Sequence, residues 1–435
     1  MRKITLITAL SLLAAHAAAA ENMDITRSVR LALDNNLYMK LAKSDGEARR
    51  AEALAAASRL LPQMELSIAQ TRTFRENLTA LGFGYAPGGG PYLIGPFDTF
   101  DGRLRLVQNL LDLGAYNASR SKEQERKAAD LRVQLAAEQV SAAAALAYLE
   151  VLRSSAAANS AAAGLELAGS LRGLAERKHA AGTATGLDVL RARTRESEET
   201  LRVSRARTSL EDALLRFKHL LGLPLRSEVS LTETLAYTPY DAPGKDEAVQ
   251  SALNDRLELK IARLQLDAGD YAVRAAKSAR VPALAVSGDA AMSGEKPDKE
   301  AKLVGDMALS LRLPLFTGGR VAAGVRGAAA ARDKASSLLS DASLQAEEDA
   351  LSALCRLQAA ADEVATASMT VTTASQELEM ARNRFAAGAG DNIELVNAQT
   401  SLSRARDSLV DALSRNKEAN IRLTLALGRM KDLKF

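Results

Sequence analysis

The chain of 435 residues consists of two copies of one pattern. The segment from His179 to Ala192 aligns without a gap with the segment from Phe385 to Ala398. The same alignment matches Leu221-Gly222 with Leu427-Gly428 near the ends of the two copies. Copy one has about 15 extra residues in a Gly- and Pro-rich loop at 82–102, where insertions cost little. Any fold for this chain must therefore build every element twice.

Each copy contains the same order of elements. The low aromatic content of 4%, the absence of Trp and the abundance of Ala, Leu, Arg and Glu favour long helices packed through small residues. Copy one (21–222) is predicted to hold a helix, a β-hairpin over 62–113, a long helix over 115–181 and a helix over 187–221. Copy two (246–428) is predicted to hold a helix, a β-hairpin over 282–317, a long helix over 320–387 and a helix over 393–427. A linker (223–245) joins the copies, and a short segment (429–435) follows.

The hairpin segments alternate between apolar and polar residues. Met307, Leu309 and Leu311 share one face of a predicted strand, and Asp306 and Arg312 share the other. Such alternation over about ten residues is typical of membrane β-barrel strands, although a soluble amphipathic hairpin has the same pattern. Two hairpins supply four strands, whereas bacterial single-chain barrels have at least about eight. We therefore expect several chains to share one barrel.

The two long helices set the dimensions of the rest. Each spans nearly 70 residues, or ~100 Å at ~1.5 Å per residue. The two shorter helices of a copy add up to about the same length, so stacked end to end they would match the long helix. A helix of this length without its own globular core needs lateral partners. The sequence predicts a tall helical wall with the β-hairpin at one end and a glycine turn at the other.

The N-terminus indicates export. Arg2 and Lys3 precede an apolar run from Ile4 to Ala15, and an Ala-rich stretch ends at Ala20. This order predicts a signal peptide over 1–20. No later apolar run of about 18 residues stands out, so we expect no transmembrane helix. The single cysteine, Cys355, lies in a helical pattern and is expected to be a small packed side chain.

No catalytic or cofactor-binding pattern is evident. Three histidines and one cysteine make a metal cluster improbable, and no metal ligands are assigned. The 57 basic and 53 acidic residues are interspersed, so no basic patch suggests nucleic-acid binding. We expect neither an enzyme nor a bound cofactor.

The turn motifs give the most specific resemblance. Gly182 to Leu190 (GTATGLDVL), Gly388 to Val396 (GAGDNIELV) and Leu313 to Gly319 (LPLFTGG) resemble the TolC family of outer-membrane efflux proteins. The resemblance implies a mostly α protein with a β membrane part. It implies a homotrimer that shares a twelve-strand β-barrel in contact with outer-membrane lipid and continues into a periplasmic tunnel of antiparallel helices. It also implies a Gram-negative outer membrane, an equatorial domain from 223–245 and 429–435, a periplasmic adaptor, and an inner-membrane pump of RND or ABC type.

The same resemblance assigns candidate site residues. Adaptor-contacting tips would comprise Gly182, Thr183, Leu187, Asp188, Gly388, Ala389 and Ile393. The periplasmic aperture would comprise Glu394, Asn397 and Gly390, with Asn397 neutral where an acid is common in the family. The strand alternation would turn Arg103, Arg105, Asp306 and Arg312 toward the barrel lumen.

Two alternatives remain open at this stage. Thr185-x-x-Asp188 and Asp391-x-x-Glu394 both have the spacing of a capping box, so both acids could simply begin helices. At the level of function, the rivals are a periplasmic helical-hairpin adaptor or scaffold without a pore, and an outer-membrane adhesin. An adaptor would not ordinarily show a duplication that includes a strand pair in each copy, and the drug or export sensitivity of a deletion strain would address the adhesin.

Overall fold

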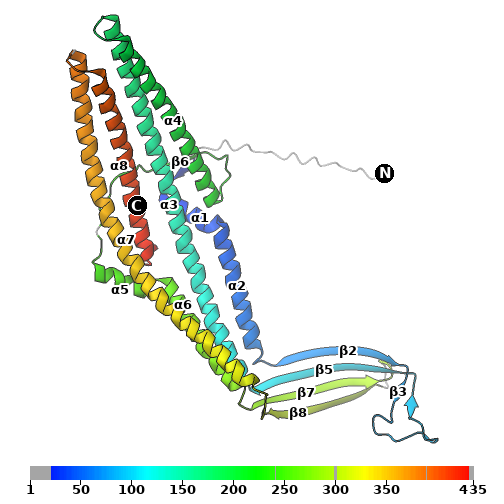
Figure 1. Ribbon diagram of the computed structural model, residues 1–435. Helices are drawn as coiled ribbons and strands as arrows, with labels where there is room; N and C mark the ends of the chain where they lie inside the picture. Colours follow the sequence, from blue (N-terminus) through cyan, green and yellow to red (C-terminus); the bar gives the residue numbers. More distant parts are fainter. Residues whose placement is uncertain (1–20, 241, 298–300, 388, 431–435) are drawn as a thin grey trace, which may run out of the picture. The chain divides into compact units, whose positions relative to one another are not determined.

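The computed structural model describes residues 21–240, 242–297, 301–387 and 389–430, and these are mostly helical (Figure 1). The predicted signal peptide (1–20), Gly388 and residues 431–435 lie outside the described residues. The described residues form two compact units, one from within 21–42, 134–256 and 344–430, the other from within 43–133 and 257–343. We call them the tip unit and the sheet unit. Each unit contains residues of both copies, so the compact units do not coincide with the sequence repeats.

The elements follow the same order in both copies. Copy one contains β1 (Glu21–Met23), α1 (Ile25–Asn35), α2 (Leu37–Ser58), β2 (Gln63–Thr73), β3 (Glu76–Asn77), β4 (Leu93–Ile94), β5 (Phe97–Leu111), α3 (Leu113–Ala180) and α4 (Gly186–Leu221). Strand β6 (Val229–Leu231) lies in the linker. Copy two contains α5 (Lys245–Asp255), α6 (Leu257–Ser278), β7 (Ala283–Gly294), β8 (Lys302–Arg312), α7 (Arg320–Ala387) and α8 (Asn392–Ala426).

The first helical stretch of each copy is divided in two, whereas the sequence predicted one continuous helix. In copy one the division falls at Asn36, whose backbone is extended. Its side chain accepts a hydrogen bond from the Tyr38 amide (2.8 Å) and donates one to the Leu220 carbonyl (3.1 Å). Arg256 divides α5 from α6 with a similar extended backbone. Asn36 forms a hydrogen bond with Leu220 of α4, which lies far along the chain. Helical periodicity alone therefore did not reveal the break.

The sheet unit contains a four-stranded antiparallel sheet in the order β2-β5-β7-β8. Strands β2 and β8 are its two edges, as Figure 1 shows. One face is apolar and exposed; Met307 there is 83% exposed. The large exposed apolar residues of the edge strands are Met64, Leu66, Ile68, Leu303, Met307, Leu309 and Leu311. The opposite face carries most of the charged residues of the strands, whereas Arg72 and Asp98, an ion pair near the far end of β2 and β5, share the apolar face.

The tip unit is held by small alanine-rich cores between helices. Tyr148 and Phe217 are fully buried between α3 and α4, with ring centroids 6.0 Å apart and planes at 61°. A second cluster joins α7 to α8 through Leu378, Phe385 and Leu395. Strand β6 of the linker pairs in parallel with β1, an N-terminal strand that the sequence analysis did not expect.

Two smaller expectations need correction. Helix α3 contains one stretch that is long and apolar enough to cross a membrane, contrary to the expectation that none exists. Half of that stretch is buried inside the protein, so it is weak evidence for a membrane span. Cys355 is exposed on this chain, whereas a packed side chain was expected.

Candidate functional site

The first turn lies between α3 and α4 and is closed by backbone hydrogen bonds. Gly182 has a φ of +72°, a left-handed conformation that favours glycine. Its amide donates to the His179 carbonyl (2.9 Å), and the Thr183 amide donates to the Lys178 carbonyl (2.9 Å). These bonds satisfy the last carbonyls of α3. The His179 ring also contacts the Ala184 carbonyl through Nδ1 (2.9 Å), so the turn is fixed on both sides.

Helix α4 begins with a complete capping box. The Asp188 amide donates to the Thr185 hydroxyl (3.2 Å), and the Asp188 carboxylate accepts from the Thr185 amide (2.9 Å) and hydroxyl (2.8 Å). Burial alone would raise the pKa of Asp188, but the hydrogen bonds from Thr185 outweigh it and the net pKa is lowered. The predicted structural role of Asp188 is therefore confirmed.

The second turn, between α7 and α8, is built differently. The Ala389 amide donates to the Arg384 carbonyl (3.0 Å) and closes the end of α7. A Cβ placed on Gly390 would lie 3.0 Å from the Arg384 Cβ and 3.2 Å from the Phe385 nitrogen, so only glycine fits there without movement. Asp391 caps α8 by accepting from the Ile393 amide (3.2 Å). Because Asp391 bonds two residues onward, no capping box with Glu394 forms.

Glu394 is therefore available for another role. Its carboxylate lies 3.6 Å from Arg384 Nε, and both side chains are largely exposed. Asn397, the neutral member of the predicted aperture set, is exposed one turn further along α8. The predicted capping box between Asp391 and Glu394 is not formed, although Glu394 does lie in the first turn of α8, and its ion pair is with Arg384 across the turn on α7.

A buried asparagine brings the two turns together. Asn392, only 3% exposed, donates from Nδ2 to the Asp188 carbonyl (3.0 Å). Beside the turns, Lys178 places its ammonium 5.2 Å from the centre of the buried Phe385 ring. The sequence analysis missed both contacts, because neither copy alone shows which residue of the other it meets. Around this contact Leu187, Leu190 and Ile393 remain exposed.

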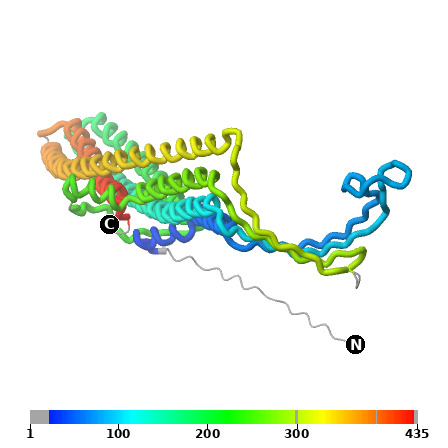
Figure 2. Tube along the Cα trace, turned by 90° about the horizontal axis from the view of Figure 1, so that it is seen from below, coloured from blue at the N-terminus to red at the C-terminus, as the bar shows by residue number. Residues whose placement is uncertain are grey.

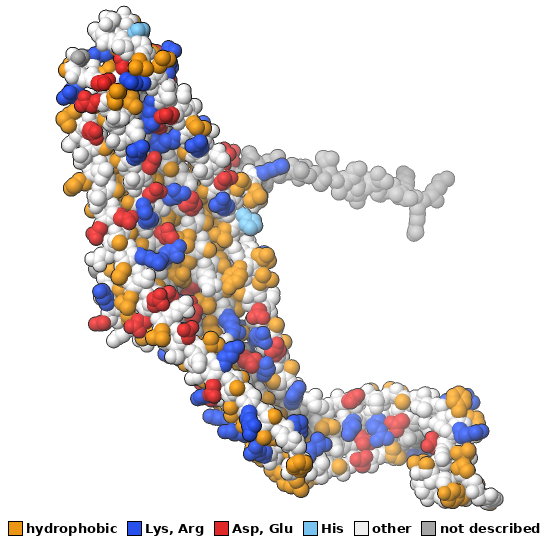
Figure 3. Space-filling model, viewed as in Figure 1, with side chains coloured by type: hydrophobic (Ala, Val, Ile, Leu, Met, Phe, Trp, Pro, Cys, Tyr) orange, Lys and Arg blue, Asp and Glu red, His pale blue; other side chains and the backbone are white. Residues whose placement is uncertain are grey.

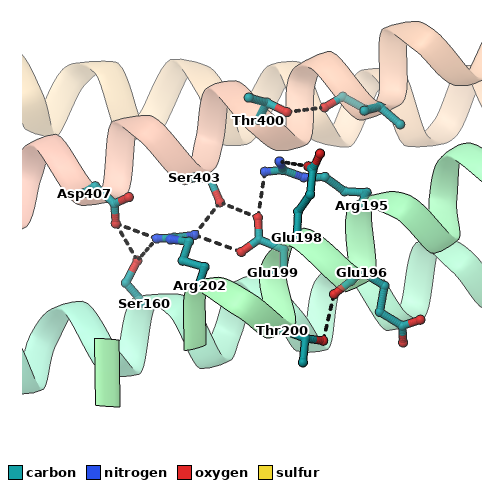
Figure 4. A network of polar contacts seen from close by, with 11 residues as sticks. Ser160, Arg195, Glu196, Glu198, Glu199, Thr200, Arg202, Thr400, Ser403 and Asp407 are labelled. Carbon is teal, nitrogen blue, oxygen red and sulfur yellow. Dashed lines mark hydrogen bonds and ion pairs between the residues drawn. The ribbon is translucent and has the colours of Figure 1, made fainter. Parts of the chain in front are cut away.

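A polar network joins α3, α4 and α8 further along the tip unit (Figure 4). The Glu199 side chain is 2% exposed and pairs with Arg195 (2.6 Å) and Arg202 (3.1 Å). Arg202 continues to the Ser403 hydroxyl (2.8 Å) and to Asp407 (2.5 Å), both on α8. A Cβ at Gly164 would lie 2.9 Å from the Glu199 carboxylate, so a glycine in the middle of α3 makes room for this charge. The only sequence signal was a glycine inside a long helix.

The charged face of the sheet contains the residues predicted for a lumen. Glu65, Arg105, Asp289 and Asp306 are direct neighbours across the four strands, so their side chains share one face. Arg103 pairs with Asp101 (3.0 Å) and with Asp289 (2.6 Å). Arg312 lies opposite Ala283, on the same face at the end of β8. The row carries both signs of charge.

Comparison with known proteins gives the family. Residues 28–223 and 248–429 match the family described as outer membrane efflux protein, which covers both copies. The protein is 24% identical over 387 residues to AprF of Pseudomonas aeruginosa, described as an alkaline protease secretion protein; these residues are 88% of this chain and 79% of AprF.

Solved structures show the same fold. The outer membrane protein VceC from Vibrio cholerae has a TM-score of 0.80 at 19% identity, covering 93% of this chain and 96% of VceC. The CmeC outer membrane channel of Campylobacter jejuni has a TM-score of 0.82 at 19% identity, covering 93% of this chain and 85% of CmeC. These likenesses confirm the mostly α, TolC-like fold.

The family match favours the channel interpretation over the periplasmic adaptor and the adhesin considered from the sequence. Family members are outer-membrane transport ducts rather than enzymes, and they act with adaptor and inner-membrane pump partners in tripartite systems. This protein therefore belongs to the TolC-like outer membrane efflux protein family, whose members form the outer-membrane exit ducts of efflux or secretion systems.

Proposed function

We propose that three copies of this chain close one twelve-strand barrel in the outer membrane. The supporting observation is the sheet itself, which has four strands and two edges, β2 and β8, each paired on one side only among the described residues. Unpaired strand edges cannot face lipid, because their backbone groups would lack hydrogen-bond partners. Pairing β2 of one copy with β8 of the next satisfies both edges.

The two faces of the sheet suit this arrangement. The exposed apolar face, which includes Ile68, Met307 and Leu309, would contact lipid. The row from Glu65 to Asp306 would then line the water-filled interior, together with Arg103 and Arg312. Charged residues of both signs tolerate this position because the lumen is wet.

Disulfide cross-linking tests the barrel directly. In a Cys355→Ser background, Glu65→Cys on β2 is combined in turn with Asp306→Cys, Ala308→Cys and Ser310→Cys on β8. We expect one combination to give linked dimers and trimers and nothing larger. The inner-strand substitution Ala290→Cys, paired with Glu65→Cys, is the matched control and should give no inter-chain link. Products that extend beyond trimers, or the absence of any link, would contradict the closed three-chain barrel.

We infer that the two turns form the periplasmic tip that meets the adaptor. The exposed apolar residues Leu187 and Ile393 lie beside the fixed turns at Gly182 and Ala389, with Thr183 and Asp188 alongside. A photo-crosslinker in place of Leu187 or Ile393 should capture the adaptor, whereas one in place of the exposed Leu344 on α7 should not. Equal capture at all three positions would remove the tip assignment.

We further infer that Glu394 lines the aperture of the assembled duct, with Asn397 and Gly390 nearby. Its freedom from helix capping supports this role. Three Glu394 carboxylates around one axis would attract cations. Bilayer recordings of Glu394→Gln should show reduced cation preference, with Glu198→Gln, another exposed acid, as the control. Unchanged selectivity would remove Glu394 from the aperture.

The cargo class follows from the partner pump, of RND or ABC type. AprF is described as a protease secretion protein, so an unfolded polypeptide is one cargo to test beside small molecules. Deletion of the gene should sensitise cells to toxic small molecules if the partner exports drugs. It should abolish secretion of a polypeptide if the partner is a secretion pump. A strain unaffected in both respects would argue against an exit duct.

A further inference from the structure

The loop between β2 and β5 is unusual in composition. From Asn77 to Phe97 the chain contains no charged residue. The whole chain has 8 Phe and 8 Tyr. Six of these aromatic residues lie in or next to this loop, at Phe74, Phe83, Tyr85, Tyr92, Phe97 and Phe100. The extra residues of copy one are in this loop. A loop that merely connects two strands in water would be rich in polar residues instead.

The loop's backbone is paired with itself. Strands β3 and β4 form a small ladder, and the Leu78 amide donates to the Tyr92 carbonyl (2.8 Å). The Thr79 hydroxyl donates to the Gly84 carbonyl (2.7 Å) and accepts from the Tyr92 amide (2.6 Å). The Ala86 amide donates to the Gly90 carbonyl (2.9 Å). Such internal pairing lets a loop enter an environment poor in water.

Its apolar side chains, by contrast, point outward. Phe74, Phe83 and Tyr85 are all more than 70% exposed, and Leu81 is exposed with them. Figure 3 shows hydrophobic side chains gathered over the end of the sheet unit that carries this loop. Contiguous exposed apolar surface of this kind indicates an interaction site. Within the loop the charged residues are Arg75 and Glu76, next to the end of β2, and the stretch from Asn77 onward carries no charge that could bind an ionic partner.

The loop continues directly from the ends of β2 and β5 (Figure 2). Phe74 follows the last residue of β2, and Phe97 is the first residue of β5. Strands β2 and β8 have 11 residues each. At ~3.3 Å per residue and a tilt of ~45°, such a strand has a height of ~25 Å, the height of the apolar band of a membrane barrel. If the proposed barrel is correct, the loop begins at the level of the lipid headgroups.

The loop of copy two at the same end of the sheet provides a contrast. Between β7 and β8 the chain reads EKPDKEA over 295–301, with five charged residues. That composition suits water. The two loops connect equivalent strands, but the side chains of the first suit an apolar medium and those of the second suit water.

We propose that the loop from Phe74 to Pro96 lies in the boundary between headgroups and acyl chains of the outer leaflet and anchors the barrel there. The partner of the exposed rings is the lipid interface, because aromatic rings favour this boundary and because the loop is continuous with the sheet that faces lipid in the proposed barrel. The inference rests on the proposed barrel. A lid over the barrel mouth, or contact between copies, would place the same rings away from lipid.

The absence of tryptophan from the chain makes a clean test possible. Three single-tryptophan proteins are reconstituted in phosphatidylcholine vesicles, with or without bromine on the acyl chains: Phe83→Trp in the loop, Met307→Trp on the apolar face of β8, and Leu344→Trp on α7. Tyr85→Trp is a second loop probe in case Phe83→Trp fails to fold. Brominated lipid quenches a tryptophan that touches acyl chains, and iodide quenches one in water.

We expect brominated lipid to quench the fluorescence of Phe83→Trp and Met307→Trp. Of the three probes, we expect iodide to quench only Leu344→Trp. If Met307→Trp is quenched by lipid but Phe83→Trp is quenched only by iodide or by neither agent, the barrel stands and the lipid anchor is overturned. If lipid quenches neither of these two probes, the proposed barrel fails as well.

Discussion

The two helical hairpins of the tip unit, α3–α4 and α7–α8, arise from one duplicated pattern but are stabilised differently. The first ends in a capping box between Thr185 and Asp188 and contains the buried charge of Glu199. The second has an apolar core around Phe385 and Leu395, and its Glu394 takes no part in capping. The duplication thus conserves the path of the backbone, while the acids at equivalent positions of the two turns have separated into a structural one and an exposed one.

The largest effect on the free energy of unfolding should come from substitution of Glu199, in the first hairpin. Glu199→Ala leaves Arg195 and Arg202 without their buried partner, which should lower the free energy of unfolding by about 3 kcal/mol. Glu198→Ala, next to it but 59% exposed, should cost less than about 1 kcal/mol. Guanidinium unfolding followed by circular dichroism measures both. Equal losses would show that the first hairpin does not depend on its buried charge.

A smaller effect is expected where the turns differ in backbone clearance. Gly390→Ala should destabilise the second turn by about 1–2 kcal/mol, because the new Cβ must displace Arg384 and Phe385. Gly186→Ala in the first hairpin meets no atom closer than 3.9 Å and should be neutral or stabilise the helix by up to about 1 kcal/mol. Amide hydrogen exchange in each turn reports the change. We expect Gly390→Ala to lower the stability of its turn and Gly186→Ala not to lower the stability of its turn. The same loss of stability at both sites would show that the two turns do not differ in backbone clearance.

Loss of the N-cap of α4 should lower the free energy of unfolding by as much as Gly390→Ala does, or by less. Thr185→Ala removes both hydrogen bonds that the Thr185 hydroxyl makes with Asp188 and should lower the free energy of unfolding by about 1 kcal/mol. The folded-state pKa of Asp188 is lowered, so its contribution to stability is fully present above its unfolded-state pKa and is lost as the pH falls through the folded value. The wild type should therefore lose more stability between pH 5 and pH 2 than Asp188→Asn does. Parallel pH profiles would contradict a capping role for the carboxylate.

The smallest effect on stability belongs to Glu394. Its contact with Arg384 is long and exposed, so Glu394→Gln should change the free energy of unfolding by less than about 0.5 kcal/mol. Any larger loss, measured by the same guanidinium titration, would indicate a structural role for this acid and bring the two turns closer in character.

The sequence predicted what depends on local pattern. The lengths of α3 and α7, the alternation of β8 and the cap at Asp188 are all encoded within a few neighbouring residues. It did not reveal contacts between distant elements. Asn392 bonding to Asp188, Arg202 reaching Asp407 and β1 pairing with β6 all require knowledge of which elements are neighbours.

The error at Glu394 has the same origin. Asp391-x-x-Glu394 fits the capping-box spacing, but Asp391 bonds to Ile393, and Arg384 on α7 offers Glu394 a charge partner across the turn. Spacing therefore gave the right answer at Asp188 and the wrong one here, and only the tertiary structure separates the two acids.

The number of chains in the assembly tests the central claim most directly. Native mass spectrometry of the complex, released intact from outer membranes in detergent, should give three times the mass of one mature chain. A monomer, or a complex with any other number of copies, would contradict a barrel that needs three four-stranded sheets to close.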